Sequence, residues 1–420
     1  MHDRFHTLFA TGTFGALLLT TSALAATPVA PTQQASTGKQ ATAKTAPPSK
    51  PVVNTVPPKT TSPIAGILDG SNGETVNVHG HHAADGTAAK YMNKVVYLGP
   101  LGNRDTLDTP YSVMGVPHDV VVNQQIRNIN DMAQYLPSVQ LEIRGDPNTS
   151  RPQSRGFEAD VVANSRLDGL NVVSTTPYPA EWVDNLQVLN GLAGAMYGPE
   201  NPAGVFEYTL KRPTNRRTER LSVGVDSIGT PTVNGDISGR VGKNGWFGYR
   251  LNMLHANGTA YTQDSWIRRE MVSGDFDIHL DDKTVIEIDA SHYTYVERGT
   301  APGFGIGANV TALPTAPDLS VSHLGQDWSG YNMETNTFLA KIKHEINKDW
   351  SFTLGGLYQD AARQAFSFNH TLLNNTGNYR QIVSPAPTAN DFQVGRNMAS
   401  FNGRAHIGSL KHDLVTGPNG

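Results

Sequence analysis

Hydrophobic and polar residues alternate with a period of two along the second half of the chain. In the stretch FGYRLNML, Phe247 and Leu251 fall on one side of an extended backbone and Arg250 falls on the other. A β-strand turns successive side chains to opposite faces, so this pattern predicts a strand with one apolar and one polar face. The pattern recurs in residues 221–226, 247–254, 272–280, 284–291, 338–346 and 350–358.

The connections between these strands differ in length. Short turns alternate with longer segments: 243–245, 281–283 and 347–349 are short, the segment after Ala256 is intermediate, and 298–332 and 364–397 are long. A soluble sandwich also has alternating strands. Transmembrane barrels, however, combine tight turns on one rim with long loops on the other, and their strands span the bilayer with about ten residues. We therefore predict that residues 214–420 form antiparallel transmembrane β-barrel strands.

The region before these strands has a mixed pattern. Two stretches, DTPYSVMGVP and RLDGLNVV, have the short apolar runs and turn residues of brief strands. Between them, IRNINDMAQYL spaces apolar residues as on one helical face, and Pro137 ends it: Ile126, Ile129, Met132, Tyr135 and Leu136. The pattern predicts a small α+β domain over residues 81–213.

The first 25 residues have the features of a secretory signal peptide. Arg4 precedes an apolar run that ends in Ala23-Leu24-Ala25, a small-residue cleavage site. A buried core helix is the alternative. Residues 26–72 are rich in Pro, Ala and Thr and hold few side chains able to fill a core, so we predict a disordered tether there.

Composition excludes several functions. The formal net charge of −4 does not favour nucleic-acid binding, and the absence of cysteine removes disulfides and thiolate chemistry. The sequence contains no G-x-S-x-G, H-E-x-x-H, EF-hand or P-loop motif, so we expect no enzyme, no catalytic residue and no cofactor. His79, His81 and His82 could bind a metal, but a Gly- and Ala-rich segment gives them no orienting partners, so we predict solvated histidines and no metal site.

Residues 183–213, VDNLQVLNGLAGAMYGPENPAGVFEYTLKRP, resemble the end of the plug domain of TonB-dependent outer-membrane receptors. Further motifs follow that family's order upstream: Asp108-Thr109-Pro110, Ser112-Val113, Ala133, Leu136-Pro137, Arg155-Gly156-Phe157 and Leu167-Asp168-Gly169. Residues 323–360 are similar to the ferric-siderophore branch, and the resemblance runs from about Glu74 to the end of the chain.

The resemblance implies a plug inside a barrel of roughly 22 strands, with Lys211-Arg212-Pro213 as the crossing from plug to barrel. About eight strands precede the final stretch LKHDLVTGPNG, so the barrel would be incomplete. The chain would then be a fragment of a longer product or a truncated, non-transporting one. Glycines allow close packing in the lumen: Gly191, Gly194, Gly198 and Gly204.

The plug departs from the family pattern at several charged positions. Where the family has Glu-Arg-x-Glu, this chain has Asp184, Asn185 and Gln187, and Asn190-Gly191-Leu192 replaces Lys-Gly-Pro. Glu207 occupies the place of the family's Asn. Much of the family's usual charge network is therefore missing, which weakens the assignment of a substrate by analogy.

The segment at 73–80 resembles a TonB box. It is an extended, β-capable stretch at the end of the tether, suited to strand addition by a TonB-type inner-membrane protein. The residues of this partner site would be Glu74, Thr75, Val76, Asn77 and Val78. A first strand of the plug is the alternative reading. Because an outer membrane has no nucleotide supply, uptake would draw its energy from this partner.

Four residues are candidates for ligand binding. Arg155 and Phe157 match the family's plug-apex motif, where a cation and an aromatic ring would meet an anionic iron chelate; a buried ion pair of Arg155 is the alternative. Tyr178 and Trp182 lie in expected loops and would line an aromatic vestibule, together with Phe304, Trp328 and Tyr331, or else form a girdle at the lipid interface.

Together these features predict an outer-membrane receptor of a Gram-negative bacterium that takes up a ferric siderophore. Its partners would be the TonB complex, the siderophore and outer-membrane lipid. A receptor of the same fold for cobalamin, nickel or a glycan remains an alternative, as does a passive porin or an adhesin.

Overall fold

A computed structural model describes residues 91–142, 151–191, 194–198, 200–226, 229–260, 262–301, 303–385 and 390–418. The expected signal peptide, tether and TonB-box segment, and His79, His81 and His82, lie outside the described residues. Among the described helices, none is long and apolar enough to cross a membrane.

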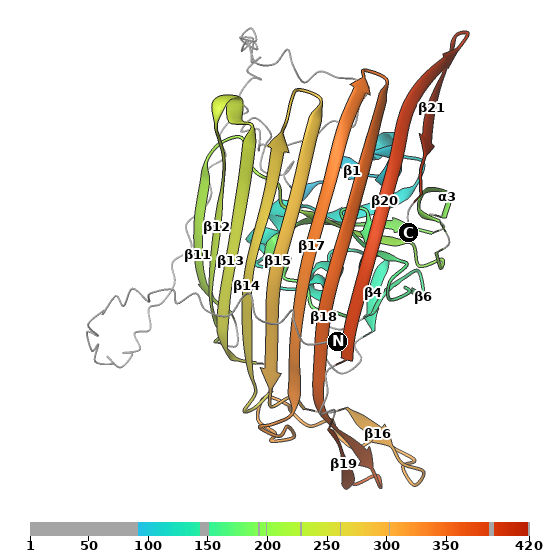
Figure 1. Ribbon diagram of the computed structural model, residues 1–420. Coiled ribbons are helices and arrows are strands. Elements are labelled where there is room, and N and C mark those ends of the chain that lie inside the picture. Colours follow the sequence, from blue (N-terminus) through green and yellow to red (C-terminus); the bar gives the residue numbers. More distant parts are fainter. Residues whose placement is uncertain are drawn as a thin grey trace, which may run out of the picture. The chain divides into compact units, whose positions relative to one another are not determined.

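The second half of the chain forms one large sheet, called the wall below (Figure 1). Its main strands pair antiparallel in chain order: β11 (Thr218–Val225), β12 (Pro231–Val241), β13 (Phe247–Thr259), β14 (Trp266–His279), β15 (Thr284–Arg298), β17 (Gly330–Asn347), β18 (Trp350–Leu372), β20 (Asn390–Ile407) and β21 (Leu410–Thr416). Sequential antiparallel pairing of this kind is the arrangement of an up-and-down barrel sheet, as the alternation predicts.

The two faces of the wall differ as the sequence predicts. On β14, Val272 points outward and is 56% exposed, whereas Asp275 points inward and is fully buried at 0%. The same division holds on β15, where Asp289 is buried and Ala290 is exposed. A soluble sheet would bury the apolar face instead. The wall is therefore built for lipid on one side and for a polar partner on the other.

One predicted loop is largely a strand. Residues 364–397 were expected to be a long connection, but β18 continues to Leu372 and β20 already begins at Asn390. The short strands β16 (Phe304–Ile306) and β19 (Tyr379–Pro385) pair with this extension of β18. The extension keeps the alternation of a strand, with Phe368 and His370 buried and Asn369 exposed, and the loop prediction overlooked it. His370 also packs on Tyr379 of β19, at 4.1 Å between ring centres.

The elements before the wall form the plug, residues 91–213 as far as they are described. Its central sheet has the order β3-β9-β10-β7-β8, with β10 and β7 parallel. The strands are β3 (Ser112–Val116), β9 (Val183–Asn190), β10 (Val205–Leu210), β7 (Ser165–Leu167) and β8 (Leu170–Asn171). Two smaller sheets flank it: β1 (Val95–Tyr97) with β2 (Asn103–Asp105), and β4 (Val139–Glu142) with β5 (Arg151–Ser154) and β6 (Phe157–Glu158).

Short helices complete the plug: η2 (Gly99–Leu101), η3 (Thr106–Asp108), α1 (His118–Asn123), α2 (Ile129–Ala133), η4 (Ala180–Trp182) and α3 (Gly194–Tyr197). α2 begins where Asn128 accepts a hydrogen bond from the Asp131 amide at 2.8 Å. It is shorter than the predicted helical stretch, and Tyr135 is exposed rather than on the buried face with Met132.

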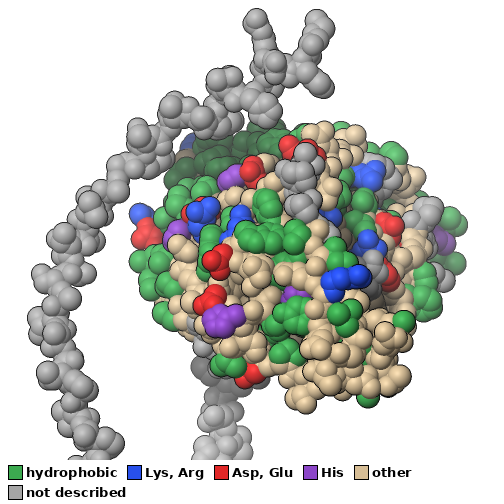
Figure 2. All heavy atoms as spheres, turned by 90° about the horizontal axis from the view of Figure 1, so that it is seen from below, with side chains coloured by type: hydrophobic (Ala, Val, Ile, Leu, Met, Phe, Trp, Pro, Cys, Tyr) green, Lys and Arg blue, Asp and Glu red, His purple; other side chains and the backbone are tan. Residues whose placement is uncertain are grey.

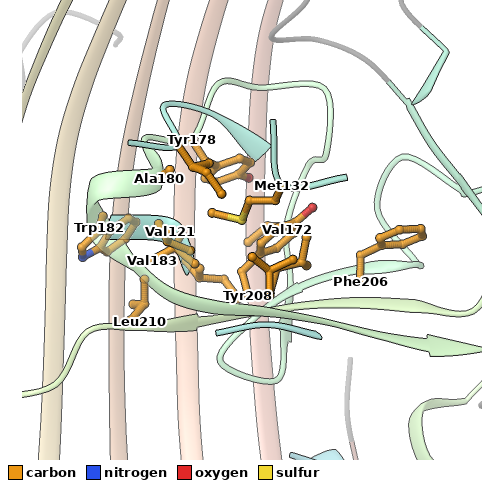
Figure 3. Close-up of a cluster of buried hydrophobic side chains, with 14 of the residues drawn as sticks. Val121, Met132, Val172, Tyr178, Ala180, Trp182, Val183, Phe206, Tyr208 and Leu210 are labelled. Carbon is orange, nitrogen blue, oxygen red and sulfur yellow. The ribbon is translucent and has the colours of Figure 1, made fainter. Parts of the chain in front are cut away.

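The largest buried cluster joins the plug to the wall. Plug residues such as Met132, Trp182 and Tyr208 pack in the same cluster as Met271 and Tyr293 of the wall. Figure 3 shows the plug part of this cluster beside the wall strands, with Trp182 and Leu210 at one end and Phe206 at the other. The apolar core is thus shared between the two regions, which positions the polar contacts described next.

Candidate functional site: the contact between plug and wall

The crossing from plug to wall is made by Lys211, Arg212 and Pro213, between the end of β10 and the start of β11. Arg212 is the centre of an ion-pair cluster at this point. Its guanidinium donates to Asp289 Oδ1 of the wall at 2.6 Å and to Asp168 of the plug, and it lies 3.6 Å from Glu287 Oε2. One cation from the crossing therefore joins carboxylates of both regions.

Lysines of the wall add further positive charge to this cluster. Lys341 Nζ lies 3.7 Å from Asp168 Oδ2, and Lys343 Nζ lies 3.0 Å from Glu287 Oε1. Because these carboxylates are buried, they are stabilised only as long as the cations stay in place. The cluster therefore couples the position of the plug to the wall.

Lys211 forms a second contact with the wall. Its ammonium group lies 3.4 Å from both Asp236 Oδ2 and Asn252 Oδ1. Arg250 binds the same Asp236 with two hydrogen bonds, at 2.9 and 2.7 Å, and donates to the Arg212 carbonyl at 3.1 Å. Burial lowers the pKa of Lys211, and the neighbouring Asp236 opposes this shift. The crossing is thus held by both its side chains and its backbone.

The turn region from Val173 to Trp182 contacts the wall through neutral and charged groups. Trp182 Nε1 donates to Asp275 Oδ1 at 2.9 Å, and Arg269 donates to Glu181 Oε2 at 2.8 Å. Gln359 of β18 accepts from the Val173 amide at 3.0 Å and donates to the Tyr178 hydroxyl. The contacts of this region reach strands β14 and β18, so it spans much of the wall.

The plug apex is a tight turn between β5 and β6. Arg155 and Gly156 both have positive φ, at 53° and 81°, so the chain reverses sharply there. Phe157 follows and is 52% exposed. Arg155 is also exposed and has no ion pair with any other residue that the structure describes. The turn therefore presents a cation and an aromatic ring to solvent.

A buried polar contact fastens this apex sheet to the central sheet. The hydroxyls of Ser138 and Ser154 both donate to Asn190 Oδ1, at 2.9 and 2.5 Å, and Asn190 donates to the Ser112 carbonyl at 3.3 Å. Asn190 stands where the family pattern noted above has a lysine. A neutral amide here replaces one of the expected charges, and it joins β9 to strands β3 and β5 and to the turn before β4.

Two of the four predicted ligand residues lie inside the molecule. Trp182 is 1% exposed and Tyr178 is also buried; burial raises the pKa of Tyr178 to about 12. Both side chains lie in the buried cluster, where Figure 3 shows them, and both contact the wall in this structure. Arg155 and Phe157 lie apart from them, in the apex turn. The TonB-box candidates lie outside the described residues.

Sequence reasoning missed the wall residues that receive the plug. Asp236, Asp275 and Asp289 occupy polar positions of alternating strands, and the alternation indicates only that they face inward. Their partners come from plug segments distant in the sequence, so no local spacing identifies the pairs. The resemblance identified Lys211 and Arg212 only as the crossing from plug to barrel and did not predict that they are the centre of the observed cluster.

The arrangement fixes the plug to the wall through buried ion pairs and hydrogen bonds. Removal of one partner from such a buried ion pair leaves the other charge uncompensated, so the contact is costly to break at any single residue. No group of three or more metal-binding side chains occurs within the described ranges.

Comparison with known proteins identifies relatives of both regions. Residues 105–205 match the family model of the TonB-dependent Receptor Plug Domain. The chain is 23% identical over 349 residues to the ferric-pyoverdine 358 receptor of Pseudomonas putida, covering 80% of this chain and 41% of that receptor. It is 24% identical to the ferrichrome receptor FcuA of Yersinia enterocolitica, covering 76% of this chain and 42% of that protein. The chain thus spans less than half the length of these relatives.

Solved structures have the same fold. The ferric preacinetobactin receptor BauA of Acinetobacter baumannii matches with a TM-score of 0.69 and 19% identity, over 79% of this chain and 50% of that one. The ferripyoverdine receptor of the outer membrane of Pseudomonas aeruginosa, bound to ferripyoverdine, matches with a TM-score of 0.67 and 15% identity, over 79% and 44% of the two chains.

Proposed function

We infer that this chain is a TonB-dependent receptor of the ferric-siderophore branch and comprises the plug and the first strands of the barrel. On this basis we propose that the protein takes up a ferric siderophore. We place it in the outer membrane of a Gram-negative bacterium, because it is similar to the ferrichrome outer membrane transporter of Escherichia coli and to the ferripyoverdine receptor of the outer membrane of Pseudomonas aeruginosa. We assign it no catalytic reaction.

The observation that carries the proposal is the plug held on the polar face of the wall. Arg212 joins carboxylates of both regions, and Lys211 reaches Asp236 across the same boundary. A passive porin or an adhesin has no need of a separate domain fixed in this way. A receptor that opens only on demand needs such a domain, because a barrel of roughly 22 strands would otherwise leave an open lumen.

Arg155 and Phe157 are the residues that we propose contact the ligand. Both are exposed in the apex turn, and a guanidinium beside an aromatic ring suits an anionic chelate with flat ring groups. Tyr178 and Trp182 are proposed to act indirectly, by fixing the plug to the wall, since their side chains are buried.

Energy for uptake is proposed to come from a TonB-type inner-membrane protein that pairs with residues 74–78. An extended segment of this kind can add a strand to a partner sheet. Pulling on it would act on the first element of the plug that the structure describes, the β1–β2 hairpin.

The test is uptake of radiolabelled iron by a receptor-deficient Gram-negative strain that expresses the full-length gene. A panel of ferric hydroxamates, catecholates and pyoverdines is expected to include one that restores growth on low iron. Deletion of residues 74–78 is expected to abolish uptake while leaving binding of the same ligand intact. Uptake that survives the deletion would refute TonB dependence, and binding of only cobalamin, nickel chelates or glycans would refute the siderophore assignment.

The ligand residues have their own test. Arg155→Ala and Phe157→Ala are expected to weaken binding of the restoring siderophore by about tenfold to a hundredfold each, the range for charged and aromatic contacts in a binding site. Arg217→Ala, at an exposed arginine directly before β11, is the matched control. Unchanged affinity in both apex variants would exclude the apex as the binding site.

A further inference from the structure

Four ionisable side chains form a buried cluster inside the plug. Arg166 lies on β7 directly opposite Glu207 on β10, Tyr197 ends α3, and Glu200 follows α3. Arg166 is 2% exposed and Glu207 is 0% exposed, and the Glu200 side chain is equally hidden. One permanent cation thus stands beside two carboxyl groups, away from solvent.

The hydrogen bonds of Arg166 are directed to groups other than Glu207. Its Nη2 lies 2.9 Å from Glu200 Oε1 and 3.3 Å from the Tyr197 carbonyl, and its Nη1 donates to the Gly169 carbonyl at 3.1 Å. Its guanidinium carbon lies 4.3 Å from the centre of the Tyr197 ring. Arg166 therefore orients Glu200 and Tyr197 together.

The side-chain carboxyl group of Glu207 has a single hydrogen bond among the residues that the structure describes. Its Oε1 accepts from the Gly169 amide at 2.7 Å, while its Oε2 is buried without a partner in the part of the chain that the structure describes. A carboxylate in this position would be poorly solvated, whereas a protonated carboxyl group would not carry that cost.

The charged neighbours of Glu207 do not remove this cost. Burial raises its pKa to about 8; the Gly169 amide, Arg166 and Lys341 of β17 oppose the shift, and Asp168 adds to it. Burial also raises the pKa of Glu200, against the effect of Arg166. The adjoining Tyr197 and Tyr208 are buried phenols whose pKa values burial raises further above neutrality.

Tyr197 connects this cluster to the first hairpin of the plug. A Cβ at Gly99 would lie 2.4 Å from Tyr197 Cε1, so the ring packs directly on the backbone of η2 between β1 and β2. Tyr197 belongs to a separate buried cluster with Val96 and Leu98 of this hairpin region. The hairpin is held additionally by the hydrogen bond of the Tyr97 amide to Gln187, at 2.8 Å.

We propose that Arg166, Tyr197, Glu200 and Glu207 form a proton-controlled clasp that holds the β1–β2 hairpin on the plug sheet, closed while Glu207 is protonated and loosened when it ionises. Ionisation releases the Glu207 proton to water and places a second carboxylate beside Arg166. That carboxylate competes with Glu200 for the guanidinium, and Tyr197 loses the cation that rests on its ring. The use of the clasp in transport rests on the proposed function, because the hairpin follows residues 74–78.

The direction of the pH effect follows from linkage. An ordinary glutamate ionises near pH 4.5, and Glu207 in the closed plug ionises near pH 8. Opening between these values releases a proton, so the closed form is fully stabilised below about pH 4.5 and loses stability as the pH rises to about 8.

Hydrogen–deuterium exchange of the full-length receptor in detergent tests the clasp. Protection of residues 95–105, corrected for intrinsic exchange rates, is expected to fall by up to about tenfold per pH unit between pH 5 and 8. Glu207→Gln keeps an acceptor for the Gly169 amide and is expected to remove the pH dependence. Glu219→Gln, at an exposed glutamate of β11, is expected to keep the wild-type slope. Equal slopes in wild type and Glu207→Gln, or a flat wild-type profile, would overturn the proposal.

Infrared difference spectroscopy of the unaltered protein supplies a second measurement if Glu207→Gln does not fold. A buried carboxylic-acid carbonyl band is expected to persist above pH 6 and to disappear near pH 8. Absence of any such band above pH 6 would also overturn the proposal. Neither measurement uses siderophore or TonB. A negative result in either would therefore refute the clasp but not the proposed uptake, and a negative uptake experiment would not refute the clasp.

Discussion

The two faces of the wall show how one set of strands is built for two different surroundings. The outward face carries half-exposed apolar side chains such as Val272 and Phe338, and the inward face carries Asp275 and Asp289, which are buried under the plug. The outward face suits contact with lipid, which requires only an apolar surface. The inward face needs a particular cation at a particular place. Substitutions on the two faces should therefore affect the stability of the protein in different ways.

Arg212→Ala should produce the largest effect on the inward face. It leaves Asp168, Asp289 and Glu287 without their shared cation, and removal of one partner from a buried ion pair costs about 3–5 kcal/mol. We expect loss of plug protection in exchange measurements and a lower melting temperature. Arg217→Ala, where the arginine is exposed beside Glu219, should change stability by less than about 1 kcal/mol. Equal effects of the two variants would contradict the central place of Arg212.

On the outward face, Ile288→Lys should cost about 2–4 kcal/mol, because a charge would enter the apolar band near its middle. The measurement is the unfolding free energy in lipid vesicles, compared with that in detergent. His292→Lys, on the same face of β15 but among exposed polar side chains, should cost about 0–1 kcal/mol. If Ile288→Lys is harmless in vesicles, the outward face does not contact lipid.

Trp182→Phe should have a smaller effect. The variant keeps most of the packing but removes the donor to Asp275, whose other oxygen is already without a partner among the described residues. An unpaired buried acceptor costs about 1–3 kcal/mol. Chemical denaturation measures the change, with Trp246→Phe at an exposed tryptophan as the control. A shift no larger than that of the control would mean that the hydrogen bond contributes little.

Ser138→Ala should have the smallest effect, about 1 kcal/mol, because Asn190 keeps its hydrogen bond from Ser154. Exchange of the apex sheet should increase while the central sheet is unaffected. Ser320→Ala, in an exposed loop, is the control. A uniform change over the whole plug would show that the apex sheet does not respond separately.

Much of the wall could be predicted from the sequence, because its strands obey a local rule. Phe247, Leu251 and Arg250 fall on their faces by position alone, and any strand of a barrel must follow that alternation. The alternation continues beyond residue 364 into the β18 extension, where Phe368 and His370 are buried and Asn369 between them is exposed, so the loop prediction there was wrong although the pattern was present. What the alternation does not report is the partner of this buried face, because Phe368 and His370 pack on aromatic side chains of other segments, Trp328 and Tyr379.

The site was less accessible to prediction. Arg155 and Phe157 could be proposed from the sequence because their motif is contiguous, and their role as ligand residues stays a prediction. Trp182 was expected to face a vestibule, since its partner Asp275 lies 93 positions away and no short spacing links the two. A buried aromatic residue and a ligand-facing one have the same appearance in a sequence.

The length of β18 has a consequence for the loops at one end of the wall. At about 3.3 Å per residue its 23 residues extend about 75 Å, well beyond the hydrocarbon thickness of a bilayer. Its extension carries β16 on one edge and β19 on the other, at the end of the molecule that Figure 2 faces. The two loops that contain β16 and β19 are therefore both attached to the same strand extension. An insertion or an antibody that displaces one loop should therefore also displace the other. The two loops are expected to vary together as a single antigenic unit.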